Sequence, residues 1–272
     1  MYIFGASTVT LTFIGLGLHD EGGISLAGLE RARLADQIYI ERYTNHMPGL
    51  SLKKLEELLG KPVSELNRRD LEELPEQTIL RDAEHRDVVL LVPGDHLVAT
   101  THIDLRLRAD KAGIPTEVVH GASIYSAVAS VVGLQIYKFG RTVTIPHPTP
   151  IYRPETPYDV LKENMAHGLH TLVLLDIDAE GARYMSVEEG LRYLLKIEEK
   201  RREGVVSLKR LAVGLSGVGS PSQKVKGGSV ESLLKADFGD PPHSLVFPAA
   251  LHFMEAEALR VFASTPEEAL RV

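Results

Sequence analysis

The stretch VVLLVPGD, residues 88–95, decides the fold. Its first five residues are all apolar, without alternation, which is typical of a strand that helices cover on both faces. The Pro-Gly pair ends the strand, and Asp95 follows at its carboxyl end. Open α/β sheets form their ligand sites at such strand ends. The stretch therefore predicts an α/β fold and places Asp95 at a candidate ligand site.

Apolar runs elsewhere predict further strands, and capping residues predict the helices between them. The predicted strands are Leu11–Leu16, Gln37–Glu41, Glu117–His120, Arg141–Ile145, Thr171–Leu175, Leu211–Leu215 and His243–Phe247. The predicted helices start at the caps Ser25 and Ser51, cover Thr100–Lys111 and Tyr158–His167, run from a capping box at Ser186 to about Glu203, and close the chain through Phe262.

This alternation predicts two α/β domains after an N-terminal extension of residues 1–10. The N-terminal domain, residues 11–120, should contain a mostly parallel sheet. The C-terminal domain, residues 121–272, should contain a mixed sheet.

The composition excludes several classes of protein. The chain has 272 residues, 44% of them hydrophobic and 25% charged, which are ordinary globular values. The net charge of -7 gives no broad electrostatic footprint for nucleic acid, so we expect no nucleic-acid partner. With 0 Cys, disulfides, Cys-ligated zinc and a thiol nucleophile are all excluded.

The sequence gives no sign of a membrane segment or of a signal peptide. No apolar run approaches the roughly 20 residues that a membrane helix needs. The first residues, MYIFGASTVT, are too short and too uncharged for a signal peptide. We therefore expect a cytoplasmic protein with no membrane partner.

Gly15-Leu16-Gly17 invites comparison with the dinucleotide fingerprint, whose third glycine would fall at Asp20. A negative side chain where a phosphate should lie argues against NAD, so we interpret the segment as a glycine turn at a strand end. The chain also lacks a Gly-x-x-x-x-Gly-Lys-Ser/Thr loop, which excludes a P-loop nucleotidase.

Other polar residues are weighed against structural roles. Asp95 could accept hydrogen bonds from a ligand, or it could form an Asx turn or cap the following helix. His167 and His170 are three residues apart, but the strand predicted at Thr171 breaks helical spacing, so solvated or core histidines are favoured over a metal site. Ser216 lacks the Gly-x-Ser-x-Gly elbow of a hydrolase. No catalytic residue and no metal site is predicted.

Several segments together resemble the diphthine synthase family, part of the tetrapyrrole methylase-like superfamily of S-adenosylmethionine methyltransferases. They are FIGLGL (13–18), PGDHLVATTH (93–102), SIYSA (123–127), GLQIYKFG (133–140), GLHTLVLLDI (168–177) and FGDPPH (238–243). One departure is His96, which stands where the family usually has proline.

The resemblance implies two α/β domains of the tetrapyrrole methylase type, with S-adenosylmethionine bound in the cleft between them, and a homodimer. It implies methylation of the amino nitrogen of a 3-amino-3-carboxypropyl group on a modified histidine of translation elongation factor 2. The cofactor contacts carried over by motif are Leu18, Asp95, Val98, Ser123, Ile124, Leu175, His243 and, from a loop that differs from the family pattern, Val218.

Two other functions remain open on the sequence. The first is another methylase of the same superfamily that acts on a tetrapyrrole or on ribosomal RNA, although the acidic charge counts against RNA. The second is a nucleotide-binding α/β protein, non-catalytic or NAD-dependent, which the missing fingerprint glycine disfavours.

Overall fold

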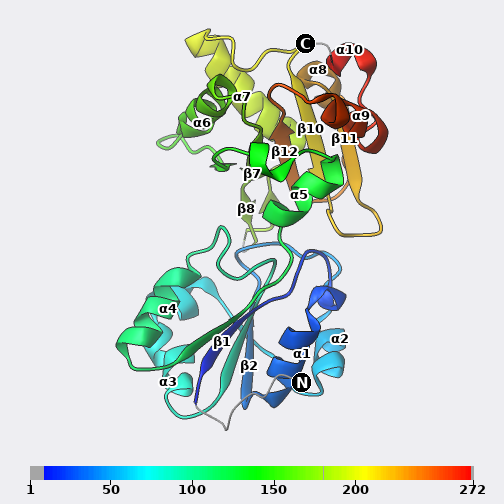
Figure 1. Ribbon diagram of the computed structural model, residues 1–272. Helices are drawn as coiled ribbons and strands as arrows, with labels where there is room; N and C mark the ends of the chain where they lie inside the picture. The colour runs from blue at the N-terminus through cyan, green and yellow to red at the C-terminus, as the bar shows by residue number, and fades with distance from the viewer. Residues whose placement is uncertain (1–8, 180, 271–272) are drawn as a thin grey trace. The chain divides into compact units, whose positions relative to one another are not determined.

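The computed structural model describes residues 9–179 and 181–270, and the chain divides after Ile124 into two compact units (Figure 1). We call the part up to Ile124 unit 1 and the part from Tyr125 unit 2. Most of the predicted extension, residues 1–8, lies outside the described residues. Within the rest, Thr10 already joins the sheet of unit 1, because its carbonyl accepts from the Val88 N–H at 2.9 Å.

Unit 1 contains a parallel sheet of five strands in the order β3-β2-β4-β1-β5, as predicted for this half. The strands are β1 (Leu11–Gly15), β2 (Gln37–Glu41), β3 (Ser64–Leu66), β4 (Val88–Val92) and β5 (Thr116–Val119). The apolar strand β4 lies at the centre, between β1 and β2, and is buried along its whole length. Its lack of alternation thus reflects two covered faces.

Helices cover both faces of this sheet (Figure 1). The helices α1 (Leu26–Leu34) and α2 (Leu52–Leu59) pack on the face that carries Val89, and α3 (Ile79–Ala83) and α4 (His102–Lys111) pack on the face that carries Leu90. Shorter helical segments are η1 (Glu21–Gly23), η2 (Arg69–Glu73) and η3 (Pro75–Gln77). Successive residues of a strand face opposite sides, so each core contains alternate residues of β4.

The two helix caps predicted in unit 1 are confirmed. Ser25 accepts from the Gly28 N–H and Ser51 from the Lys54 N–H, which fixes the first turns of α1 and α2. Gly60 ends α2 with φ +71°, a conformation that favours glycine. The helix predicted from Thr100 begins only at His102.

Unit 2 contains a mixed sheet of five strands in the order β11-β10-β12-β7-β6, again as predicted. The strands are β6 (Val143–Ile145), β7 (Thr171–Leu175), β10 (Leu211–Ser216), β11 (Lys224–Ser229) and β12 (His243–Phe247), and a separate pair is formed by β8 (Ile177–Asp178) and β9 (Arg183–Tyr184). Only β6 and β7 pair in parallel among the described strands of this unit.

The helices of unit 2 pack around this sheet, and α5 spans the division between the units. They are α5 (Ile124–Val132), η4 (Ile136–Lys138), α6 (Thr156–Ala166), α7 (Val187–Arg201), α8 (Val230–Leu233), α9 (Phe253–Phe262) and α10 (Glu267–Leu270). The capping box of Ser186 and Glu189 at the start of α7 is confirmed. The predicted end at Glu203 is wrong, because Arg202 already adopts a left-handed conformation with φ 56° and its N–H bonds to the Glu198 carbonyl.

None of the helices in the described part of the chain combines the length and the apolar character that crossing a membrane requires.

Candidate functional site

The carboxyl ends of β1 and β4 lie side by side in unit 1, and the chain leaves them toward opposite faces of the sheet. After β1 it continues into α1 on one face, and after β4 it continues into α4 on the other. Such a topological switch point leaves a crevice at the strand ends, where open α/β sheets bind their ligands.

Three glycines allow the backbones at this edge to approach one another closely. A Cβ atom on Gly15 would lie 2.6 Å from the Gly94 carbonyl oxygen, and one on Gly121 would lie 2.5 Å from it. Gly17 and Gly94 also exchange two backbone hydrogen bonds, of 3.1 and 2.7 Å. The loops that follow β1, β4 and β5 are therefore held together by direct backbone contact.

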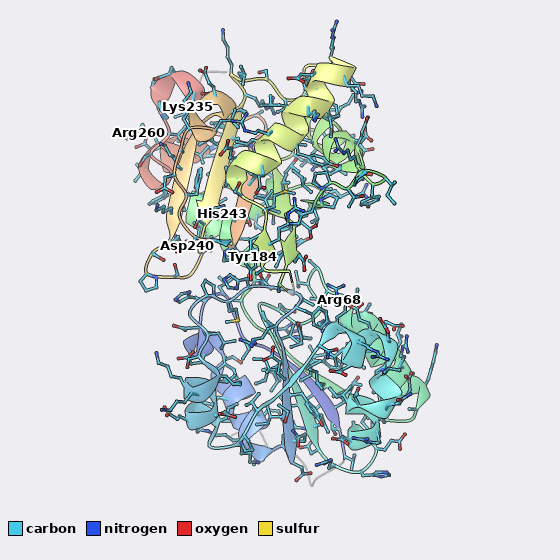
Figure 2. The ribbon with its side chains drawn as sticks, turned by 180° about the vertical axis from the view of Figure 1, so that it is seen from behind. Arg68, Tyr184, Lys235, Asp240, His243 and Arg260 are labelled. Atoms are coloured by element: carbon cyan, nitrogen blue, oxygen red, sulfur yellow. The ribbon has the colours of Figure 1, made fainter. Side chains whose placement is uncertain are left out.

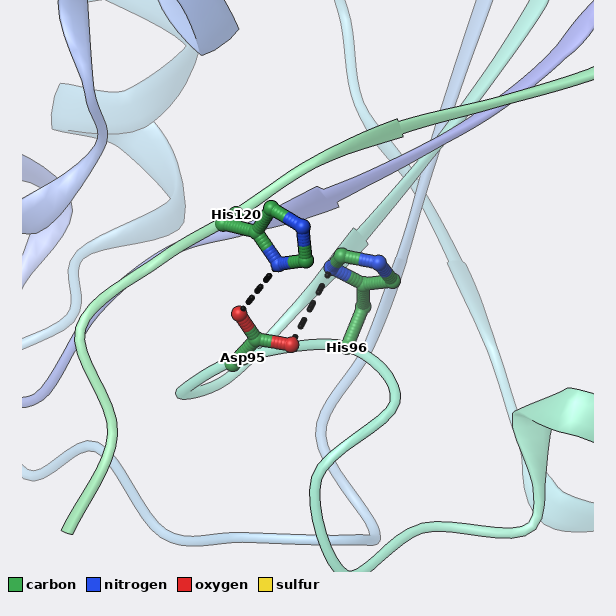
Figure 3. A group of neighbouring side chains, drawn as sticks. All are labelled: Asp95, His96 and His120. Carbon is green, nitrogen blue, oxygen red and sulfur yellow. Dashed lines mark hydrogen bonds and ion pairs between the residues drawn. The ribbon is translucent and has the colours of Figure 1, made fainter. Parts of the chain in front are cut away.

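Asp95 lies directly after this contact, with only 8% of its surface exposed. Its Oδ2 accepts a hydrogen bond from His120 Nδ1 at 2.9 Å (Figure 3). Its Oδ1 receives a long contact of 3.4 Å from the Leu97 N–H. The cap of α4 is Thr101, so the alternative of Asp95 as a helix cap is wrong. The Leu97 contact has the spacing of the other alternative, an Asx turn, although it is long. Each carboxylate oxygen can accept two hydrogen bonds, so the contacts of Asp95 within the described part of the chain leave acceptor capacity unused.

His96 and His120 lie on either side of this carboxylate (Figure 3). His96 is fully buried, at 0% exposure, and neither of its ring nitrogens has a hydrogen-bond partner among the described residues. Its Nδ1 lies 3.7 Å from Asp95 Oδ1. Burial lowers the pKa of His96, so the ring is neutral at physiological pH. The side chain of His120, by contrast, is 78% exposed.

The other residues that the sequence assigned to this half lie at the same edge. Leu18 follows β1, Val98 follows β4, and Ser123 and Ile124 follow β5. Ser123 is buried, at 8% exposure, and the other three side chains are partly buried. The parallel order of these strands thus brings together residues more than a hundred positions apart.

The loop after β1 does not have the form of a dinucleotide fingerprint. Asp20 caps the short segment η1 by accepting from the Gly22 N–H at 3.0 Å. The helix α1 begins only at Leu26, whereas the fingerprint needs a helix directly after its glycine turn. The interpretation of Gly15-Leu16-Gly17 as a turn at a strand end is confirmed.

In unit 2, the predicted residues Leu175, Val218 and His243 also share one sheet edge. Leu175 ends β7 and Val218 follows β10, while His243 begins β12, which runs antiparallel to both. His243 pairs with Ser216 in the strand register, so the start of β12 lies beside the end of β10. Figure 2 labels His243 beside Asp240 at this edge.

The side chain of His243 is already occupied by hydrogen bonds within unit 2. The Val187 N–H donates to Nδ1 at 3.3 Å, so Nε2 must carry the proton that it donates to the Gly239 carbonyl at 3.1 Å. Burial lowers the pKa of His243, which keeps the ring neutral. Leu175 belongs to the hydrophobic core. Both residues can therefore offer a ligand their backbone more readily than their side chains.

A second buried carboxylate, Glu255, ties together a polar cluster in the same unit. Its exposed fraction is 1%, and it accepts hydrogen bonds from Lys138 Nζ and, at 3.0 Å, from His170 Nε2. His170 Nδ1 accepts from the Ala249 N–H at 2.9 Å, so this histidine is satisfied within the core. His167 is the exposed C-cap residue directly after α6. The expectation of core or solvated histidines is thus confirmed for both.

At the sheet edge around Asp95 in unit 1, two features were not predicted from the sequence. They are the contribution of His120 and the burial of His96. His120 comes 25 residues after Asp95, and no local spacing connects the two. The signal that could have found His120 is topological, because Asp95 and His120 lie in the loops that leave β4 and β5, the two strands that flank β1 in a parallel sheet.

Comparison with known proteins agrees with this architecture. The family of tetrapyrrole (corrin/porphyrin) methylases matches residues 10–234. The diphthine synthase of Methanocella arvoryzae is 52% identical over 93% of this chain and 98% of its own, and that of Methanosarcina mazei is 50% identical over 95% and 97%. A crystal structure of diphthine synthase superposes with a TM-score of 0.86 at 41% identity, covering 96% of this chain and 99% of its own. The chain belongs to the diphthine synthase family of the tetrapyrrole methylases.

Proposed function

We propose that this methyltransferase takes its methyl groups from S-adenosylmethionine and transfers them to translation elongation factor 2 in the cytoplasm. The acceptor is the amino nitrogen of the 3-amino-3-carboxypropyl group on a modified histidine. Support comes from relatives named diphthine synthase that are 50% and 52% identical over nearly their whole length. The observation that carries the proposal is the buried, under-used carboxylate of Asp95 at the switch point of a parallel sheet.

The residues at this edge suit a cofactor that carries hydroxyl and ammonium donors. Asp95 can accept hydrogen bonds from such groups, and its low exposure would strengthen them. A Cβ atom on Gly94 would have only Asn45 Nδ2 within 4 Å, at 3.8 Å, so the backbone is open on that side. Leu18, Val98, Ser123 and Ile124 in unit 1, and Leu175, Val218 and His243 in unit 2, are the proposed further contacts.

The chemistry asks the protein mainly for positioning. A bound sulfonium cofactor supplies an electrophilic methyl group, which transfers by in-line displacement. The residues of this chain then need to orient the cofactor and the acceptor amine and to exclude water. This requires neither a covalent nucleophile nor a catalytic triad, so the lack of Cys is compatible with the reaction. We assign no catalytic residue.

Transfer to the elongation factor can be measured directly. The protein is incubated with labelled S-adenosylmethionine and with elongation factor 2 that carries the 3-amino-3-carboxypropyl group. We expect label on the modified histidine and none on a control factor whose histidine is unmodified. Equal labelling of both factors, or labelling only of a tetrapyrrole or of ribosomal RNA, would contradict the proposed acceptor.

The cofactor can be tested separately by calorimetry. We expect saturable binding of S-adenosylhomocysteine and none of NAD, because the loop after β1 lacks the fingerprint geometry. Saturable binding of NAD without binding of S-adenosylhomocysteine would overturn the proposal.

We further propose that the protein is a homodimer, as its family resemblance implies. Large apolar side chains that are exposed on η4 and α9, Tyr137 at 77% and Phe253 at 77% among them, are compatible with self-association. Sedimentation at micromolar concentration should show a species of twice the 29.9 kDa chain mass. A single species at the chain mass would contradict it.

A further inference from the structure

Asp95, His96 and His120 bring three possible metal ligands together within unit 1 (Figure 3). One ligand atom from each residue lies within 4.8 Å of the other two. Asp95 Oδ2 is 2.9 Å from His120 Nδ1, and Asp95 Oδ1 is 3.7 Å from His96 Nδ1. Ligands on one tetrahedral ion with bonds of about 2.0 Å are about 3.3 Å apart, so these separations lie on either side of the required one.

A hydrogen bond between Asp95 and His120 would not by itself explain why the ring of His96 is buried without a hydrogen-bond partner in the described part of the chain. Its ring is 0% exposed, and both nitrogens lack a hydrogen-bond partner among the described residues. A buried polar group without a partner costs about 1 to 3 kcal/mol, and coordination of an ion is one way in which proteins remove that cost. Because Nδ1 faces the Asp95 carboxylate, an ion held between them would satisfy that nitrogen.

The donor set indicates which ions would bind. Two imidazole nitrogens and one carboxylate oxygen suit zinc and its transition-metal neighbours, whereas magnesium and calcium prefer oxygen ligands alone. The carboxylate carries a negative charge and a neutral imidazole carries none, so the set attracts a cation. The side chain of His120 is 78% exposed, which gives an ion a path from solvent.

We propose that Asp95, His96 and His120 bind one divalent transition-metal ion of the zinc type. Three protein ligands leave a coordination position open for water or for a small ligand. The site is a new one, distinct in chemistry from the methyl donor, although it shares Asp95 with the proposed cofactor contacts.

The test is a titration of the full-length protein, stripped with a chelator, with zinc chloride in a calorimeter. We expect one zinc ion per chain in this site. His120→Ala should weaken binding by at least about 10-fold to 100-fold, because that is the loss for a group that only orients a metal ligand and His120 is itself a proposed ligand. His85→Ala is the matched control, because the His85 side chain is 77% exposed and has no place in the cluster. It should leave the zinc affinity unchanged.

Cobalt gives a second readout that reports on the buried ligand. Co²⁺ bound by two imidazoles and a carboxylate should show visible absorption bands in the wild-type protein, and His96→Asn should abolish them. Equal zinc affinity in the wild type and His120→Ala, or no saturable zinc binding in the wild type, would overturn the proposal. His120→Ala changes an exposed residue, so the test survives if His96→Asn fails to fold. Neither titration uses the cofactor, so a negative result leaves the proposed methyl transfer untouched.

Discussion

Glu255 in unit 2 and Asp95 in unit 1 are both buried carboxylates paired with a histidine, but they differ in how fully the protein satisfies them. Glu255 accepts from Lys138, from His170 and from two backbone N–H groups. Burial alone would raise the pKa of Glu255, yet these hydrogen bonds outweigh it and lower the pKa to about 2. The carboxylate is thus fully used in holding unit 2 together.

Asp95 receives one good hydrogen bond, from His120, and one long contact, from the Leu97 N–H. The comparison teaches that burial and a histidine partner do not by themselves mark a functional carboxylate. The distinguishing property is acceptor capacity left over after the internal donors are counted. By that criterion Glu255 is structural, and Asp95 is available to a ligand.

The largest effect should be a loss of stability when Glu255, the carboxylate whose hydrogen bonds are all satisfied, is replaced. Glu255→Gln keeps the volume but leaves the partly buried Lys138 against a neutral amide, and losing one partner of a buried ion pair costs up to about 3 to 5 kcal/mol. Urea unfolding should show this loss in the free energy of unfolding. A loss below about 1 kcal/mol would mean that Glu255 is not the structural centre of its cluster.

The pH dependence of the free energy of unfolding should show the same stabilising role of Glu255. The folded pKa of Glu255 is about 2 and its ordinary value is 4.5. Its stabilisation is therefore present above pH 4.5 and is lost as the pH falls toward 2, by about 3 kcal/mol in total. The difference in unfolding free energy between the wild type and Glu255→Gln should narrow as the pH falls below 4.5. A constant difference would show that ionised Glu255 gains nothing from its donors.

Asp95→Ala should have the opposite profile, with an effect on ligand affinity instead of folding. If Asp95 accepts a hydrogen bond from the cofactor, S-adenosylhomocysteine should bind about 1.5 to 3 kcal/mol more weakly, roughly 10-fold to 150-fold. Calorimetry and thermal unfolding on the same variant separate the two effects.

Ser51→Ala is the control for Asp95→Ala, because Ser51 is a true helix cap. It should lower stability by about 1 kcal/mol and leave the affinity for S-adenosylhomocysteine intact. Reduced stability with unchanged affinity in Asp95→Ala would place Asp95 with the structural carboxylates.

A smaller change in affinity than most of the range for Asp95→Ala is expected from competition between zinc and the cofactor, a prediction that rests on both proposals. Because each uses Asp95, zinc at ten times its dissociation constant should weaken S-adenosylhomocysteine binding about tenfold. His120→Ala should reduce this competition. If zinc binds without weakening the cofactor analogue, then Asp95 is not shared between the two ligands.

Four strands could be predicted to the residue, namely Gln37–Glu41, Val88–Val92, Thr171–Leu175 and His243–Phe247. The predicted strands Leu11–Leu16 and Leu211–Leu215 are each wrong by one residue at the carboxyl end, because an apolar run locates a buried strand but does not define where its pairing stops. The edge strand β11 (Lys224–Ser229) was not predicted, since its lysines and glycines show no strand pattern and its place depends on pairing with β10. Helix α5 was also not predicted, because Gly121 and Ala122 before it are typical of a loop.

Only the part of the candidate site that follows from a single predicted strand could be predicted from the sequence. The position of Asp95 follows from the apolar run before it. The neighbouring His120 directly follows β5, and only the strand order, with β1 between β4 and β5, brings it within hydrogen-bond reach of Asp95. The burial of His96 depends on packing against Phe13 of β1, with ring centroids 6.1 Å apart, which no local pattern encodes.

The backbone contact of Gly15, Gly94 and Gly121 has a consequence for how such proteins can diverge. An added side-chain carbon at Gly15 or Gly121 would collide with the Gly94 carbonyl, so a change at either would need compensating shifts in the other loops. His96, two residues after Gly94, and His120, directly before Gly121, have no positive φ and so need no backbone conformation that favours glycine. Descendants of this chain can therefore acquire or lose ligand groups beside Asp95 while inheriting the same scaffold.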